Sequence, residues 1–246
     1  MNKDKVIKWV RDYLNSFGGN TKAVIGISGG KDSTVAAKLC VEAVGPERVI
    51  GVLLPQGTQH DINVSRAVCE YLGIKSYEIN IGKVCEDLAS QIAMITSFEP
   101  LKNYVYYSNT PARIRMTTLY GMAALLGDSR VVNTCNRSED YVGYSTKFGD
   151  SAGDFSPLSN LTVREVKELG YQLEIPKEFI EKAPEDGLSG KTDEDNLGFT
   201  YETLDSYLLD GVKPAPEVLE KIERMHRNNL HKLLPMPSYK PEEEAE

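Results

Sequence analysis

The chain has 246 residues, of which 41% are hydrophobic and 26% charged, and its net charge at pH 7 is −8. This length and composition suffice for one domain with a full hydrophobic core, so we expect residues 1–246 to form a single domain. The acidic net charge excludes a general nucleic-acid surface, and no apolar run is long enough to cross a membrane. We therefore expect a cytoplasmic protein that binds neither nucleic acid nor membranes. The cysteines are scattered and lack a C-x-x-C pair, which predicts reduced thiols at Cys40, Cys69, Cys85 and Cys135.

The first hundred residues alternate between helical and strand patterns. Apolar spacing predicts helices over residues 3–17, 32–44, 61–72 and 82–96, and strands over residues 23–28, 48–55 and 75–81. Strand-helix-strand units with short connections form right-handed parallel crossovers. The fold class is therefore α/β, a doubly wound, Rossmann-like parallel sheet with helices on both faces. Residues 20–160 are the expected nucleotide-binding core, with ligands at the carboxyl ends of the strands.

The sequence SGGKDS, residues 28–33, follows the first strand and opens an Ala-rich helix. Gly29 and Gly30 have no Cβ and tolerate positive φ, so their N–H groups can approach an anion beside the helix N-terminus. Asp32 would repel phosphates unless a cation lay between them, so it indicates Mg²⁺. The alternative is a glycine turn in which Asp32 is an ordinary helix cap. The pattern is neither a Walker A loop nor a dinucleotide fingerprint. It resembles the PP-loop of the ATP pyrophosphatases, which adenylate an acceptor and release pyrophosphate.

A long helix is expected over residues 108–127, with Asn109 as its cap and Pro111 in its first turn. Arg113 and Arg115 are two residues apart, so they point to different sides of this helix and cannot serve one anion from the same face. One of them is expected to bind phosphate or carboxylate and the other to form a structural salt bridge. A solvated surface position is the alternative for either arginine.

Two connections at the carboxyl edge of the sheet are unusually polar. Residues 54–61, LPQGTQHD, either meet an adenine or ribose or form an ordinary loop. The fourth strand, residues 130–135, opens into residues 136–158, which are dense in Gly, Tyr and charged groups. Connections of this length inside a compact domain are functional or disordered, and the aromatic residues favour order.

The remaining residues, 161–246, are expected to form a helical extension and a lid. Thr162 and Glu165 have capping-box spacing, and residues 183–195 form a Gly/Asp-rich stretch that can order over a ligand. The terminal helix carries a basic patch of Arg224, His226, Arg227, His231 and Lys232. For His231 and Lys232 the alternative is that they only complement the helix dipole.

Seven blocks of sequence together resemble the ammonia-dependent NAD synthetase family, in its order and at close to its spacing. They are SGGKDS (28–33), LPQGTQ (54–59), ARIRM (112–116), SEDYVGYSTKFGD (138–150), DFSPL (154–158), KAPEDGLSGKTDEDNLG (182–198) and HK (231–232). The resemblance extends along most of the chain. It implies ATP-dependent amidation of deamido-NAD by ammonia, giving NAD, AMP and pyrophosphate through an adenylated intermediate.

The resemblance also implies the roles of individual residues. ATP would be bound by Gly26, Ile27, Ser28, Gly29, Gly30, Lys31, Asp32, Ser33 and Thr134. Deamido-NAD would be bound by Arg113, Lys147, Asp154, His231 and Lys232. Mg²⁺ would be bound by Asp32 and Glu139, and catalysis would rest on Asp32, Glu139 and Asp150. The resemblance also implies the homodimer typical of the family, with some of these residues acting across its interface. No N-terminal catalytic cysteine is present, so ammonia is expected to be used free, and a separate glutaminase subunit stays open.

Two positions depart from the family pattern. Many members have a Lys where this chain has Val163 followed by Arg164, and a Thr or Ser where it has Glu185. Both positions typically meet ATP phosphates. Arg164 lies about 100° further around the helix, so it replaces the Lys only if the geometry shifts.

Two other functions compete with this prediction. Another PP-loop adenylating enzyme would act on GMP precursors, amino acids or tRNA, but the chain has no paired cysteines or basic surface for RNA and no room for a glutaminase domain. A nucleotide-binding sensor of the universal-stress type would share the fold without chemistry, and it would have little need for both Asp32 and Glu139.

Overall fold

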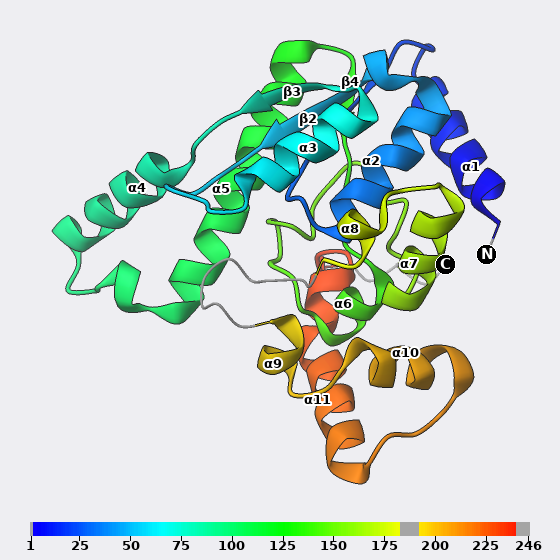
Figure 1. Ribbon diagram of the computed structural model, residues 1–246. Coiled ribbons are helices and arrows are strands. Elements are labelled where there is room, and N and C mark those ends of the chain that lie inside the picture. Colours follow the sequence, from blue (N-terminus) through cyan, green and yellow to red (C-terminus); the bar gives the residue numbers. More distant parts are fainter. Residues whose placement is uncertain (1, 183–191, 240–246) are drawn as a thin grey trace, which may run out of the picture.

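The computed structural model describes residues 2–182 and 192–239, and its centre is a sheet of four parallel strands in the order β3-β2-β1-β4 (Figure 1). The strands are β1 (Lys22–Gly26), β2 (Val49–Leu53), β3 (Lys75–Glu78) and β4 (Ser129–Val131). In the register, Val24 of β1 lies opposite Ile50 on one side and Val131 on the other. The expected α/β fold class is confirmed.

Helices cover both faces of the sheet. They are α1 (Lys3–Asn15), α2 (Lys31–Val44), α3 (Ile62–Leu72), α4 (Gly82–Ile95), α5 (Tyr104–Leu126), α7 (Val163–Gln172) and α8 (Lys177–Ile180), with 3-10 turns at Pro46–Arg48 and Pro100–Lys102. Apolar residues of α1, α2, α3, α7 and α8 form one core cluster with the sheet, and residues of α4 and α5 form another. Because β1 and β2 are apolar on both faces, each is buried between two helical layers.

A third apolar cluster lies beyond the carboxyl edge of the sheet. It joins α6 (Arg137–Val142), α9 (Asp193–Leu197), α10 (Tyr201–Asp210) and α11 (Pro216–Leu233) in the lower part of Figure 1. Leu204 and Ile222 are fully buried in this cluster, and burial of each such side chain stabilises the fold by about 1.5–3 kcal/mol. The cluster holds α6 and α11 side by side, and both helices carry residues of the expected site.

The long helix begins earlier than its sequence pattern predicts. Asn103, rather than Asn109, caps α5 by accepting a hydrogen bond from the backbone N–H of Tyr106, and Pro111 lies inside the helix. Aromatic and β-branched residues fill the first turn of α5, and such residues do not favour helix on their own. Asn109 instead accepts a hydrogen bond from the hydroxyl of Thr146 at 2.8 Å.

Other expectations for local structure have mixed outcomes. The fourth strand is shorter than residues 130–135, and the connection after it contains helix α6, which was not expected. The capping box of Thr162 and Glu165 is confirmed at the start of α7. All four cysteines are buried free thiols, as predicted. In residues 2–182 and 192–239, no helix combines the length and apolarity that crossing a membrane requires.

Candidate active site

Hydrogen bonds within the SGGKDS turn fix its conformation. Ser33 Oγ donates to the carbonyl of Gly30 at 3.1 Å, and the N–H of Gly30 donates to Ser28 Oγ at 3.2 Å. Gly29 has a φ of +80°, and a Cβ there would lie 3.1 Å from the backbone nitrogen of Ser65 in α3. Glycine is thus required at this position by both conformation and space. The turn directs α2 and its N-terminal N–H groups at the carboxyl edge of the sheet.

Three charged side chains meet just beyond this turn. Lys31 is almost fully buried and its Nζ lies 2.7 Å from Asp32 Oδ2, while Asn136 Nδ2 donates to Asp32 Oδ1 at 3.1 Å. Asn136 also caps α6, where its backbone N–H donates to Glu139 Oε2 at 3.3 Å. One asparagine therefore connects the carboxylate after β1 with the carboxylate after β4.

The ionisation of these groups reflects their proximity. Burial raises the pKa of Glu139 well above its usual range and the charge of Asp32 raises it further, whereas Lys31 lowers it. Burial lowers the pKa of Lys31, but Asp32 and Glu139 outweigh that effect and the net shift is upward. Two neighbouring carboxylates with one lysine between them favour an additional positive charge.

Asp32 and Glu139 fit a magnesium ion. Mg²⁺ binds one or two carboxylates and completes its octahedral shell with phosphate oxygens and water. In the described ranges, no group of three or more His, Cys, Asp or Glu side chains is placed to hold a metal. The donor set thus suits a metal that arrives with a phosphate ligand rather than one held by the protein alone.

Asp150 lies in the connection between α6 and α7. Its Oδ1 accepts a hydrogen bond from the N–H of Thr146 at 2.9 Å, and its carbonyl accepts from Asn133 Nδ2 at 2.8 Å. Burial raises the pKa of Asp150. Burial also raises the pKa of Asp140 to about 6, and the charge of Asp150 contributes to this second shift. Thr134, expected at the nucleotide, follows Asn133 directly in the chain.

Four of the five residues expected at deamido-NAD come together. Arg113 Nε donates to the carbonyl of Lys147 at 3.2 Å, and Lys147 Nζ donates to the carbonyl of His231 at 2.5 Å. Lys232 Nζ donates to the carbonyls of Gly143 and Ser145 at 2.6 and 2.8 Å. The middle of α5, the loop after α6 and the end of α11 therefore meet at one place.

Asp154 is the fifth, and it lies alongside β4 rather than beyond its end. Its Oδ2 accepts from the N–H of Val131 at 2.7 Å, and its Oδ1 accepts from the hydroxyl of Tyr120 at 3.3 Å. Tyr13 of α1 donates to the carbonyl of Asp154 at 3.0 Å. The structure does not bring Asp154 into contact with the other four residues.

Comparison with known proteins decides the family. The model of the NAD synthase family matches residues 3–243. The chain belongs to the NAD synthase family. NH(3)-dependent NAD(+) synthetases from Carboxydothermus hydrogenoformans and Thermococcus kodakarensis are 37% and 41% identical, over 93% and 83% of this chain and 93% and 79% of their own lengths. As a member of this family, the chain is a ligase.

Solved structures of the family share the fold. NMN synthetase from Francisella tularensis has a TM-score of 0.84 and 34% identity, covering 98% of this chain and 99% of that one. NH3-dependent NAD synthetase from Campylobacter jejuni has a TM-score of 0.74 and 28% identity, covering 98% of this chain and 100% of that one. The agreement extends over essentially the whole length of both relatives.

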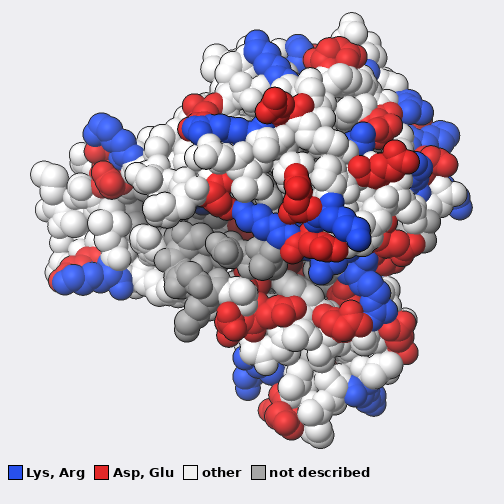
Figure 2. Space-filling view, in the orientation of Figure 1, with Lys and Arg blue, Asp and Glu red and all other residues white. Residues whose placement is uncertain are grey.

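Arg164 does not stand in for the lysine that many NAD synthases have near this position. Its guanidinium bonds Asp210, Glu202 and Ser206 at 2.8 to 2.9 Å, all on α10. A hollow of about 610 Å³ lies beside Lys31, and its wall includes Val163, Arg164 and, one turn later, Lys167. Figure 2 shows Lys and Arg side chains interspersed with Asp and Glu on this face of the molecule. Glu185 and most of the expected lid, residues 183–195, lie outside the described residues.

Two features of this NAD synthase differ from the sequence prediction. Asn136 was not expected to contact Asp32, although its spacing from Glu139 is a capping-box signal that identifies it. Neither Arg113 nor Arg115 forms the expected salt bridge with any described residue. Arg115 Nε instead donates to the carbonyl of Leu54 at 3.1 Å, because the helix places it over the end of β2.

Proposed function

We propose that this enzyme amidates deamido-NAD with ammonia, consuming ATP and giving NAD, AMP and pyrophosphate. The observation that carries the proposal is the meeting of Lys31, Asp32 and Glu139 at the SGGKDS turn, in a chain that the family matches over residues 3–243. Arg113 and Lys232, from α5 and α11, both contact the loop after α6.

The first step makes a poor electrophile reactive. A nicotinate carboxylate oxygen attacks the α-phosphorus of ATP, an O–P bond forms, and the bond from that phosphorus to pyrophosphate breaks. The N–H of Gly29 and the start of α2 would bind phosphate oxygens, and Thr134 would contact the nucleotide. Catalysis at this step consists of positioning and charge stabilisation.

The second step forms the amide. Ammonia attacks the carbonyl carbon of the adenylate, a C–N bond forms, and the C–O bond to AMP breaks. Asp150 is the carboxylate on the substrate side of the site, and its raised pKa suits it to accept the proton that the nitrogen loses. The reaction needs no nucleophilic cysteine, since the phosphate is the only activating group.

Asp32 and Glu139 would hold Mg²⁺. When bound, the ion neutralises phosphate charge and thereby favours departure of pyrophosphate. Lys31 lies against Asp32 at 2.7 Å and adds positive charge on the same side. Asn136 orients the Asp32 carboxylate, so these two residues prepare the phosphate side of the site.

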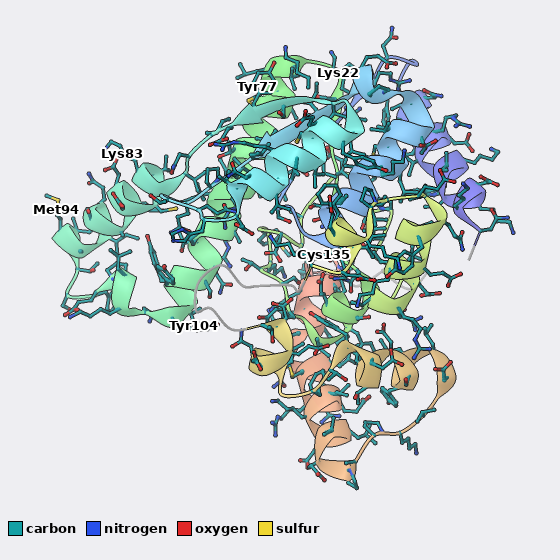
Figure 3. The ribbon with its side chains drawn as sticks, viewed as in Figure 1. Lys22, Tyr77, Lys83, Met94, Tyr104 and Cys135 are labelled. Carbon is teal, nitrogen blue, oxygen red and sulfur yellow. The ribbon has the colours of Figure 1, made fainter. Side chains whose placement is uncertain are left out.

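The active form is proposed to be a homodimer. An arm formed by α4 and the start of α5 extends from the sheet, and Figure 3 shows Met94 at the outer end of this arm. Its large exposed apolar residues include Met94, Ile95, Phe98, Leu101, Tyr104 and Val105. Apolar surface of this kind marks an interface. Ile95→Glu should convert a dimer, measured by light scattering, to a monomer; a wild-type monomer contradicts the assignment.

A mononucleotide substrate is the second candidate. The Francisella tularensis relative, named NMN synthetase, has a higher TM-score and identity than the Campylobacter jejuni NAD synthetase. Asp154 lies apart from the other deamido-NAD residues, and the four that remain can bind either nucleotide acid. The ratio of kcat/KM for deamido-NAD and nicotinate mononucleotide separates the two substrates.

Product analysis tests the proposed function. The purified chain is mixed with ATP, Mg²⁺, ammonium and deamido-NAD at mildly alkaline pH, and each component is omitted in turn. We expect NAD, AMP and pyrophosphate in equal amounts, with no turnover when any component is missing. Formation of ADP and phosphate, or AMP only with some other carboxylate or with tRNA, contradicts the proposal. Replacing ammonium by glutamine tests whether a separate glutaminase is needed for that donor.

A further inference from the structure

Arg115 occupies a position between the two halves of the candidate active site. On the same face of α5, Leu119 lies beside Gly26, the last residue of β1, where an added Cβ would be 3.5 Å from its side chain. Arg115 lies one turn before Leu119, and its Nε bonds the carbonyl of Leu54, just past the end of β2. Its side chain therefore lies beyond the carboxyl ends of β1 and β2, where the SGGKDS turn begins.

The opposite side of Arg115 faces the substrate loop. Ala112, almost one turn before Arg115, packs against Gly149, where an added Cβ would lie 3.0 Å from that of Ala112. Asp150 follows Gly149. Burial lowers the pKa of Arg115, and the charges of Cys85 and Asp150 partly offset that shift. The guanidinium thus lies at the end of β2 and near enough to Asp150 for the two charges to interact.

The guanidinium has unused hydrogen-bonding capacity. Arginine has five N–H donors, and among the described residues only the Nε of Arg115 has a hydrogen bond, with no ion-paired carboxylate. Arg115 is only partly exposed. A partly buried guanidinium without an anion is costly, which favours a ligand that supplies the missing negative charge.

Resting on the proposed function, we propose that Arg115 binds the carboxylate of the nicotinate ring and orients it toward the α-phosphate of ATP. The planar guanidinium matches a carboxylate through two parallel N–H···O bonds. A carboxylate held there would lie between the turn that carries ATP and the basic residues Arg113 and Lys232.

The other basic groups are less suited to this carboxylate. Lys31 lies against Asp32 on the phosphate side. Lys147 and Lys232 already donate to backbone carbonyls, and Arg113 does so through Nε from an exposed position. The phosphates of ATP have the turn and its metal ligands, which leaves Arg115 for the carboxylate of the second substrate. Arg115 therefore acts as the group that distinguishes an acid from its amide.

The test compares acid and amide forms of the same nucleotide. Isothermal titration measures Kd for deamido-NAD and NAD, and for nicotinate and nicotinamide mononucleotide, with the wild type and Arg115→Gln. Loss of a charge-assisted pair should reduce the preference for the acid by roughly 10- to 100-fold, while the affinity for the amide stays unchanged. Arg115→Lys, which keeps the charge but not the two-pronged donor, should lose less of the preference.

Arg66→Gln is the matched control, since it removes the same charge from an exposed ion pair with Glu78. It should leave the preference for the acid unchanged. Thermal melting verifies the fold of each variant, and Arg115→Lys decides the matter if Arg115→Gln does not fold. An unchanged preference in the variants, an equal loss for acid and amide, or a loss of ATP affinity alone overturns the inference. Wild-type NAD or NMN formation in the same preparation shows whether the proposed function stands independently.

Discussion

The two sides of the candidate active site are built differently. On the phosphate side, Lys31 and Asp32 are paired within a buried turn, and Asn136 fixes the carboxylate from the neighbouring strand. On the side proposed to bind deamido-NAD, which we call the nucleotide-acid side, Lys147 and Lys232 donate to backbone carbonyls of other segments. The first side is completed by the sheet itself, because β1 and β4 are neighbours and their carboxyl ends meet.

The two sides depend on different kinds of contact, local on the phosphate side and long-range on the other. The phosphate side needs only local sequence and strand order, so it is preformed before any ligand binds. The other side depends on contacts between α5, the loop before Asp150 and the end of α11, which are far apart in the chain. Substitutions on the phosphate side should therefore abolish catalysis, whereas substitutions on the other side should weaken binding of one substrate.

The largest expected effect is on the phosphate side. Asp32→Ala should lower kcat/KM by roughly 10³-fold, because charge stabilisation of the phosphates is lost, and should abolish the dependence of turnover on Mg²⁺. Asp87→Asn, which removes an exposed carboxylate from α4, should leave both unchanged. Steady-state kinetics over a range of Mg²⁺ concentrations measures the effect. Normal ATP binding with otherwise unaltered behaviour in Asp32→Ala favours the nucleotide sensor instead.

A smaller, substrate-selective effect is expected on the other side. Lys232→Ala removes a partly buried cation. Burial lowers the pKa of Lys232, and the negative charge of Asp150 partly offsets that shift. KM for deamido-NAD should rise by roughly 10- to 100-fold, the scale of a charge-assisted hydrogen bond, while KM for ATP changes little. Parallel increases in both KM values mean that Lys232 only holds the loop through Gly143 and Ser145.

The pH dependence of stability sharpens the comparison. Burial raises the pKa of Asp140 to about 6, so the folded protein binds this proton more tightly than the unfolded chain. The resulting loss of stability develops as pH rises from about 4 to about 6 and persists above it. In EDTA, Asp140→Asn should raise the free energy of unfolding by roughly 1–3 kcal/mol at about pH 8 and by nothing at about pH 3.5. An equal gain at both pH values refutes this origin.

The smallest expected effect concerns helix α7. Thr162→Ala removes the capping box of α7 and should lower the free energy of unfolding by about 1 kcal/mol. Thr117→Ala, on the exposed face of α5, should change it by less than about 0.5 kcal/mol. Urea denaturation measures both. An equally large loss of unfolding free energy in Thr117→Ala means that the effect of Thr162→Ala does not come from its cap.

The sequence predicts the phosphate side better than the nucleotide-acid side, for physical reasons. The turn around Gly29 and Asp32 is a local signal, because a buried strand, two glycines and a helix start are adjacent in the chain. The contact of Lys232 with Gly143 spans 89 positions and leaves no local pattern; only resemblance to a family indicated it. The start of α5 was misplaced because its first turn lacks helix-favouring residues, and only Asn103 marks it.

The central claim is that the nicotinate carboxylate attacks the α-phosphorus of ATP. Deamido-NAD labelled with ¹⁸O in that carboxylate tests it most directly, with mass spectrometry of the AMP formed in the presence of ammonium and Mg²⁺. If the carboxylate is adenylated, one ¹⁸O atom appears in each AMP molecule and the amide of NAD keeps the other. AMP free of label, with ¹⁸O in phosphate or pyrophosphate instead, would contradict the account.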